Sequence, residues 1–77
     1  MDAKKILKLR NRVGWSQSEM ATAIGSSKMI ISHWETGLKP PSGITSRFLS
    51  LLYSLSDSDL KKITKILESL GKEKSDD

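Results

Sequence analysis

Two short segments on either side of Gly25 constrain the fold more than any other feature of the chain. The first opens with Ser16 and Glu19, whose three-residue separation is that of a capping box at the start of a helix. Gly25 and Gly37 follow the two segments, where a residue in the left-handed conformation commonly closes a helix. Helices this short are marginal in water when isolated. The pattern therefore predicts two short helices that are stable only when packed within a larger domain.

The segments before and after this pair are also patterned for helices. Residues 3–13 repeat apolar side chains at helical spacing and stop before Gly14. Residues 38–43 contain both prolines and are predicted to be a loop, after which Ser42 or Thr45 is expected to cap a helix. No segment alternates as a strand would. The predicted apolar stripes are Ile6, Leu9 and Val13 in the first of these helices, and Ile44, Phe48, Leu51, Leu52 and Leu55 in the second.

A fifth helix is predicted over residues 57–70. Ser56 and Asp59 form a second capping box before it, and Gly71 is expected to end it. The five helices make up a single all-α domain over residues 1–71, and the remaining residues 72–77 are expected to form a polar tail.

The apolar residues of the fifth helix recur three and four positions apart, which is the spacing of a heptad seam. We expect Leu60 and Ile63 to lie in the core. The helix is longer than a core of this size requires, so its later apolar residues are candidates for a dimer or partner surface. The alternative, with all of them folded against the same domain, stays open. The candidates are Ile66, Leu67 and Leu70.

The chain has 77 residues and a formal net charge of +4, which is unevenly distributed. Residues 1–55 hold eight lysines and arginines against three acids, a balance of +5, whereas residues 56–77 hold five against six. A domain of this size buries only about 60% of its unfolded surface, which leaves little room for a deep catalytic cleft. The positive charge suits a phosphate-backbone partner, although it also serves ordinary solubility.

Other classes of protein find little support in the sequence. Cysteine is absent and His33 is the only histidine, so we expect no disulfide, metal site or cofactor. No nucleophile elbow, Gly-rich phosphate loop or pair of catalytic acids is present, so we do not expect an enzyme. No apolar run approaches the ~20 residues of a membrane span, and the first residues lack the apolar region of a secretory signal. A cytoplasmic location is the simplest expectation.

The two short helices must cross at a steep angle, because only a few residues join them. Ala21 is the small residue that lets their backbones approach, and Gly25 can adopt a positive φ in the turn without steric strain. The face of the second helix that packing does not use then points outward. It combines a cation, two hydrogen-bonding groups and a flexible apolar side chain, which suits base edges in the major groove of DNA. The expected core anchors are Met20, Ile24, Ile31 and Trp34, and the outward face is Lys28, Met29, Ser32 and His33.

On these residues the segment resembles the helix-turn-helix of the phage repressor and Cro (XRE-like) family. Six of its seven diagnostic positions fit, and the seventh, usually apolar, is Ser26. The resemblance extends from about Leu9 to Leu55. It implies a five-helix, lambda-repressor-like domain that binds double-stranded DNA. The six fitting positions are Met20, Ala21, Ile24, Gly25, Ile31 and Trp34.

The resemblance also implies roles for individual residues. Arg10 and Glu35 match a pair that bridges two helices beneath the DNA surface. Whether that pair is exposed and worth under ~1 kcal/mol, or is a partly buried strut, stays open. Trp15 and Trp34 are expected to pack in the core rather than stack on bases. The positions implied to read bases are Lys28, Met29, Ser32 and His33, and those implied to contact the DNA backbone are Gln17, Ser27, Thr36 and Lys39.

The leading functional hypothesis is a sequence-specific transcriptional regulator, most simply a repressor that occupies an inverted-repeat operator as a homodimer. One recognition helix touches only a few base pairs, whereas a two-fold dimer places two such helices one turn of DNA apart. The alternative is an antitoxin-type protein, in which the fifth helix or the tail binds a toxin and the protein represses its own operon. In both cases we expect association with the nucleoid when DNA is bound.

Overall fold

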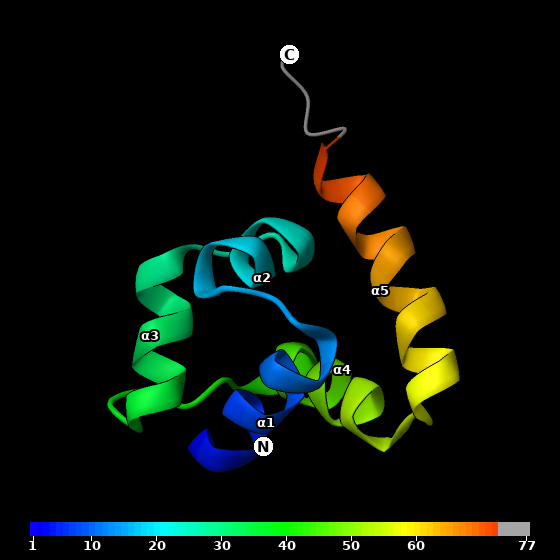
Figure 1. Ribbon diagram of the computed structural model, residues 1–77. Coiled ribbons are helices and arrows are strands. Elements are labelled where there is room, and N and C mark those ends of the chain that lie inside the picture. The colour runs from blue at the N-terminus through cyan, green and yellow to red at the C-terminus, as the bar shows by residue number, and fades with distance from the viewer. Residues whose placement is uncertain (73–77) are drawn as a thin grey trace.

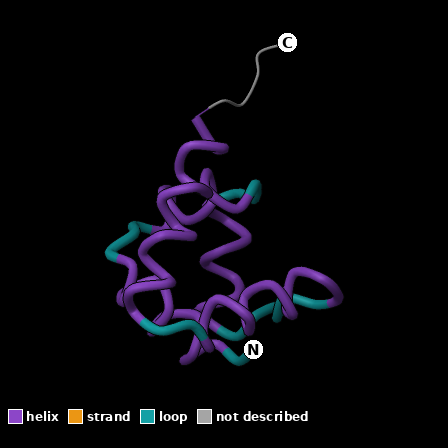
Figure 2. Tube along the Cα trace, turned by 90° about the vertical axis from the view of Figure 1, so that its right-hand side faces the viewer, coloured by secondary structure: helices purple, strands orange, loops and turns teal. Residues whose placement is uncertain are grey.

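A computed structural model of the protein describes residues 1–72, and within them it contains five α-helices and no strand (Figure 1). Short loops join the helices (Figure 2). The expected all-α architecture is confirmed. Of the tail predicted over residues 72–77, Lys72 belongs to the last helix, and residues 73–77 lie outside the described residues. The helices are α1 (Ala3–Val13), α2 (Gln17–Ile24), α3 (Lys28–Thr36), α4 (Gly43–Ser54) and α5 (Asp57–Lys72).

The starts of the first two helices follow from local side-chain chemistry. Asp2 accepts a hydrogen bond from the backbone N–H of Lys5 at 2.9 Å, and this bond lowers the pKa of the Asp2 carboxyl. Ser16 and Glu19 form the predicted capping box before α2, with distances of 3.0 and 2.7 Å. Ser42 occupies the N-cap of α4, but its side chain makes no capping hydrogen bond.

The core lies among α1, α2, α3 and α4 and is closed by the first turns of α5. Met20, Ile31 and Trp34 belong to it, as the crossing of the two short helices requires, whereas Ile24 is only half-buried. Trp15 is buried as well, so both tryptophans pack in the core. The largest fully buried side chains are Ile6, Leu9, Met20, Ile31, Leu49 and Leu52.

The stripe of α4 that enters the core differs from the predicted one. Leu49 and Leu52 are fully buried, whereas Ile44 is 84% and Leu51 58% exposed. The physical reason is that α4 packs mainly against α1, so the flank that carries Leu49 is covered and the opposite flank is open. Phe48, Leu52 and Leu55 of the predicted stripe do pack on the core, whereas Leu49 was not predicted there.

The core-facing stripe of α5 also differs from the predicted one, in that Thr64 takes the place expected for Ile63. Leu60 is 2% and Thr64 3% exposed, whereas Ile63 is 37% exposed. The Thr64 hydroxyl donates to the carbonyl of Lys61 at 3.2 Å, so its burial leaves no unpaired polar group. Leu67, which was expected on a partner surface, is half-buried against the core.

Gly71 does not end α5, which continues to Lys72. A Cβ atom at Gly71 would lie 2.7 Å from the backbone oxygen of Thr22 and 3.1 Å from its methyl group. Glycine is therefore required here by the close approach of α5 to α2, the helix against which it mainly packs, and not by a left-handed turn.

Arg12 ties α1 to the junction between α4 and α5. Its guanidinium donates to the carbonyl of Tyr53 at 3.0 Å and to that of Leu55 at 2.9 Å, groups that the end of α4 leaves without helical partners. It also pairs with the carboxylate of Asp57 at 2.7 Å. Arg12 thereby fixes where α5 begins, and its charge is already engaged within the fold.

Candidate nucleic-acid interface

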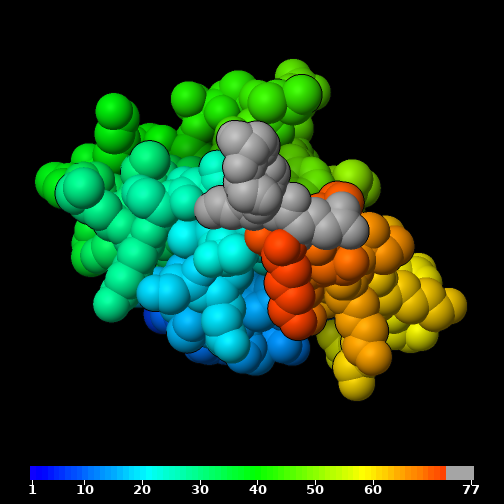
Figure 3. Space-filling view, turned by 90° about the horizontal axis from the view of Figure 1, so that it is seen from above, coloured from blue at the N-terminus to red at the C-terminus, as the bar shows by residue number. Residues whose placement is uncertain are grey.

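The outward face of α3 carries the four residues that the sequence singled out for base reading. Lys28 and Met29 are exposed, Met29 by 65%, while Ser32 and His33 one turn later are half-buried. The opposite face of the helix buries Ile31 and Trp34. α3 stands on the opposite side of α2 from α5 (Figures 1 and 3), so the face that it presents is separate from the surface of α5.

α3 is held in place at its end by a carboxylate that joins three helices. Arg10 of α1 donates to Glu35 through two of its nitrogens, one of them at 3.0 Å, and Gln17 of α2 donates to the same carboxylate at 3.0 Å. A further Arg10 nitrogen donates to the carbonyl of Trp15 at 2.9 Å. The side chains of Arg10 and Glu35 are only 16% and 7% exposed, so the ion pair is partly buried. The hydrogen-bonded group of Arg10, Glu35 and Gln17 is called the strut.

No pattern in the sequence predicts the contact between Gln17 and Glu35. Gln17 opens α2, and its amide was expected to face DNA. An amide nitrogen carries two hydrogens, and the contact with Glu35 uses one of them. The strut therefore positions Gln17 and leaves a second donor at the start of α2.

The remaining predicted backbone contacts lie at the two ends of α3. Ser27 precedes the helix, and its hydroxyl accepts from the N–H of Ile30 at 3.2 Å, which caps α3. At the other end the Thr36 hydroxyl and the Lys39 N–H both donate to the carbonyl of His33 at 3.3 Å. The structure thus places Ser27, Thr36 and the exposed Lys39 around the ends of the helix that carries the residues predicted to read bases.

The turn between α2 and α3 has the geometry that the sequence predicts. Gly25 has φ of 77°, in the left-handed region, and its N–H donates to the carbonyl of Ala21. The N–H of Ser26 donates to the same carbonyl at 2.8 Å. A family model described as helix-turn-helix matches residues 6–60, which span this turn and the helices around it.

The chain belongs to the Cro/XRE-type helix-turn-helix family. No curated protein and no solved structure matches the sequence of this chain. The family consists of DNA-binding transcription regulators rather than enzymes, and this helix-turn-helix protein is accordingly a DNA-binding transcription regulator. Within residues 1–72, every helix of the protein is too short or too polar to cross a membrane.

The pKa of the Glu35 carboxyl depends on its burial and on its hydrogen bonds from Arg10 and Gln17. Burial of the carboxyl raises its pKa, but the hydrogen bonds from Arg10 and Gln17 outweigh this, and the pKa is lowered from its ordinary value of 4.5. The Arg10 pKa is raised, first by its hydrogen bonds to Glu35. The charged pair is therefore favoured in the folded protein.

This lowered pKa predicts a pH dependence of stability. A carboxyl whose pKa is lower in the folded state contributes stability above its ordinary value, and that contribution is lost as the pH falls through the folded value. We expect the wild-type protein to lose free energy of unfolding as the pH falls below about 4.5, whereas Glu35→Gln should lose less over the same range. Urea unfolding at a series of pH values measures both. Parallel curves for the two proteins would show that Glu35 is not linked to stability in this way.

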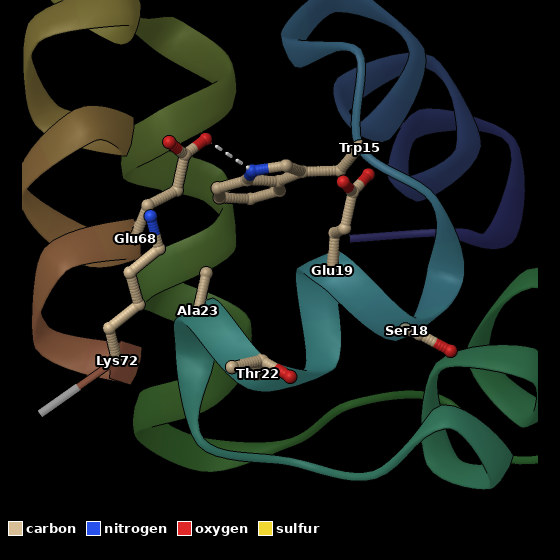
Figure 4. Close-up of a pocket in the computed structure, with 7 residues that line it drawn as sticks. All are labelled: Trp15, Ser18, Glu19, Thr22, Ala23, Glu68 and Lys72. Atoms are coloured by element: carbon tan, nitrogen blue, oxygen red, sulfur yellow. Dashed lines mark hydrogen bonds between the residues drawn. The ribbon is translucent and has the colours of Figure 1, made fainter. Parts of the chain in front are cut away.

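A hollow between α2 and α5 lies on the far side of α2 from α3 (Figure 4). The Trp15 indole reaches across it and donates to the Glu68 carboxylate at 2.8 Å. The hollow has a volume of about 350 Å³ and also borders Glu19, Ala23 and Lys72. No sequence pattern predicts the Trp15–Glu68 bond, because 53 residues separate its partners. This bond joins α5 to the segment before α2, and α5 also lies close to α2 at Gly71.

The three predicted partner-surface residues of α5 do not share one face. Ile66 and Leu70 are 56% and 57% exposed, whereas Leu67 is half-buried against the core. Ile63, one turn before Ile66, completes the exposed apolar stripe. This stripe of Ile63, Ile66 and Leu70, named the α5 stripe below, lies beyond residues 6–60, the segment that the family model matches.

Proposed function

We propose that the protein is a repressor that occupies an inverted-repeat operator as a homodimer, with α3 of each copy in the major groove. The observation that carries this proposal is the outward face of α3, which the strut of Arg10, Glu35 and Gln17 fixes relative to α1 and α2. A rigid face that mixes a cation, hydroxyl and imidazole groups and a thioether offers donors, acceptors and an apolar contact for base edges. On this proposal the protein acts in the cytoplasm, bound to the nucleoid.

The proposal divides the DNA contacts between two kinds of residue. Lys28, Met29, Ser32 and His33 read bases. Contacts to the sugar–phosphate backbone come from the ends of α3 and from the start of α2. A helix start directs its backbone N–H groups at a phosphate, and the second amide hydrogen of Gln17 adds another donor there. The backbone residues are Gln17, Ser27, Thr36 and Lys39.

Substitutions on the two kinds of residue should separate specific from non-specific binding. We expect Lys28→Ala and His33→Ala to weaken the specific site relative to random DNA by ~1–3 kcal/mol, because each removes a contact to a base edge. Gln17→Ala should weaken both DNAs about equally, because it contacts a phosphate. Binding titrations on a site selected from a random DNA pool provide the measurement.

The matched control is Lys62→Ala, which removes an exposed cation from α5, on the other side of α2 from α3. It should leave the preference for the selected site unchanged. If Lys28→Ala and His33→Ala lowered binding to both DNAs in parallel, the base-reading face would be wrongly identified.

The α5 stripe is the proposed contact between the two copies. Three exposed apolar side chains on one helix face favour association, because their burial removes apolar surface from water. α5 lies on the opposite side of α2 from α3, so two copies joined through α5 leave both base-reading faces free. A selected site that is an inverted repeat would support this symmetry.

Charged substitutions on the stripe should separate dimerisation from folding. We expect the double variant Ile66→Lys, Leu70→Lys to keep its helical circular dichroism while losing dimer in sedimentation and affinity for a two-half-site operator. Binding to a single half-site should stay as in the wild type, because α3 is untouched. Leu67→Lys is the contrasting variant, since Leu67 packs on the core and its replacement should destabilise the fold. A double variant that sediments as the wild-type dimer would contradict this assignment of the interface.

The second candidate function is that of an antitoxin that represses its own operon. It is favoured by the same α5 stripe, which lies outside the segment that the family model matches and offers an apolar surface to a toxin. Co-purification of a neighbour-encoded protein with the wild-type chain, but not with the Ile66→Lys, Leu70→Lys variant, would favour the antitoxin over the simple repressor.

A further inference from the structure

A groove between α3 and α4 is lined mainly by apolar side chains. One hollow of about 490 Å³ lies between the α2–α3 turn and α4, and it borders Ile24, Ile44 and Phe48. A second hollow of about 420 Å³ continues along α3 to the proline-containing loop. The two share Ile30, Trp34 and Thr45, so they form one continuous surface, the α3–α4 groove.

The groove leaves apolar surface exposed that the fold does not use. Ile44 is 84% exposed and Ile30 43%, and both face the groove from opposite helices. Met29, at 65% exposure, lines the second hollow. Contiguous exposed apolar surface of this kind is typical of a site where another chain docks. α5 contributes no residue to these two hollows, but a further hollow lined by Leu70 of the α5 stripe shares Ile24, Gly25 and Ser26 with the first.

The charge around the groove favours one kind of occupant. From Met20 to Ser56 the only acid is Glu35, and its carboxylate is already bonded to Arg10 and Gln17. The exposed cations of the same segment are Lys28, Lys39 and Arg47. A second copy that packed groove to groove would bring like charges together without acids to pair them. An acidic partner would instead be attracted.

The groove also shares residues with the base-reading face. Met29 and His33 line its second hollow, and both belong to the set proposed to read bases. Lys39 lines the same hollow. A chain that fills the groove therefore covers part of the surface that DNA requires, and the two ligands exclude one another.

We propose that the α3–α4 groove binds an acidic, amphipathic segment of a partner protein, and that this binding displaces DNA. Apolar residues of the segment fill the hollows beside Ile44 and Trp34, and its carboxylates face Lys39 at the end of the second hollow. The partner would act as an antirepressor. The competition with DNA rests on the proposed function, whereas the binding of the segment does not.

The test uses a labelled synthetic peptide with leucine and phenylalanine on one helical face and glutamate elsewhere, titrated onto the full chain and followed by anisotropy. We expect binding that weakens about tenfold or more with Ile44→Ser, because one large apolar contact is lost. Leu51→Ser is the matched control, since Leu51 is exposed on α4 but lines neither hollow. It should leave binding within about twofold, a change of under 0.5 kcal/mol.

Two control peptides test the chemistry of the occupant. One has the same composition in an order that scatters the apolar residues, and the other replaces glutamate by lysine. Both should bind far more weakly than the acidic amphipathic peptide. Equal binding of either control, equal effects of Ile44→Ser and Leu51→Ser, or no binding of the acidic peptide at millimolar concentration would overturn the proposal. Loss of dimer in Ile44→Ser would also overturn it, by placing a second copy in the groove.

The competition is measured separately, by adding the unlabelled peptide to the complex of the protein with its selected DNA site. The peptide should release the DNA from the wild-type protein, and Ile44→Ser should resist release. Simultaneous binding of peptide and DNA would overturn the claim of displacement. A chain that binds the peptide but no DNA at all would instead contradict the proposed function and leave the groove site standing.

Discussion

Replacement of Glu35 by alanine should destabilise the domain by about 2–4 kcal/mol, because it leaves the Arg10 guanidinium partly buried without its counter-charge. The loss should exceed that of an ordinary surface pair, since the same carboxylate also accepts from Gln17. In a domain of this size, each 1 kcal/mol corresponds to a fall of roughly 4–8 °C in Tm. Chemical unfolding followed by circular dichroism measures the effect directly.

Asp57→Ala is the matched control for this change. Asp57 also pairs with an arginine of α1, but its side chain is 90% exposed, so removal of that carboxylate should cost less than ~1 kcal/mol. The double variant Arg10→Met, Glu35→Leu should recover much of the stability that Glu35→Ala loses, because it removes both charges and not one. Equal losses of unfolding free energy in Glu35→Ala and Asp57→Ala would show that the partial burial of the Arg10–Glu35 pair adds no stability.

The strut also connects stability to DNA binding. Gln17 is bonded to Glu35 and stands at the start of α2, so Glu35→Ala frees the side chain proposed to contact phosphate. Affinity for random and selected DNA should then fall together, even under conditions where the variant is fully folded. A folded Glu35→Ala protein that binds both DNAs as the wild type does would show that Gln17 needs no support from the strut.

The sequence predicted the bounds of α1 and α2 and the end of α3 at Gly37, because the signals at these helix ends are local. A capping box acts between residues three positions apart, and the φ of Gly25 is set within a single turn. The contact between Gln17 and Glu35 is different, since 18 residues separate its partners and no periodic pattern connects them. The pairing of Arg10 with Glu35 was predicted only through the family resemblance.

The faces of α4 and α5 could not be predicted from spacing alone, because each helix carries two apolar stripes. In α4 the stripes of Leu49 and Ile44 have comparable side chains, and only the position of α1 decides which is covered. In α5 the covered stripe contains Thr64 and Gly71, which a search for large apolar residues passes over. Glycine takes position 71 because the end of α5 lies so close to α2.

Gly71→Ala should destabilise the protein, although alanine stabilises most exposed helix positions relative to glycine by roughly 0.5–1 kcal/mol. The added Cβ would stand 2.7 Å from the backbone oxygen of Thr22, which has no side-chain rotation by which to move away. The end of α5 must then shift from α2, and overpacking of this kind typically costs 1–3 kcal/mol. We therefore expect a net loss of stability, measured by thermal or urea unfolding.

Ser69→Ala is the matched control, because Ser69 is exposed on the same turn of α5 and alanine there changes helix propensity without a contact. It should leave the protein unchanged or slightly more stable. Thr22→Ala in the Gly71→Ala background should recover little, because the closest contact is with the Thr22 backbone and not with its methyl group. If Gly71→Ala proved as stable as Ser69→Ala, α5 would not be pressed against α2, and the glycine would act at the helix end after all.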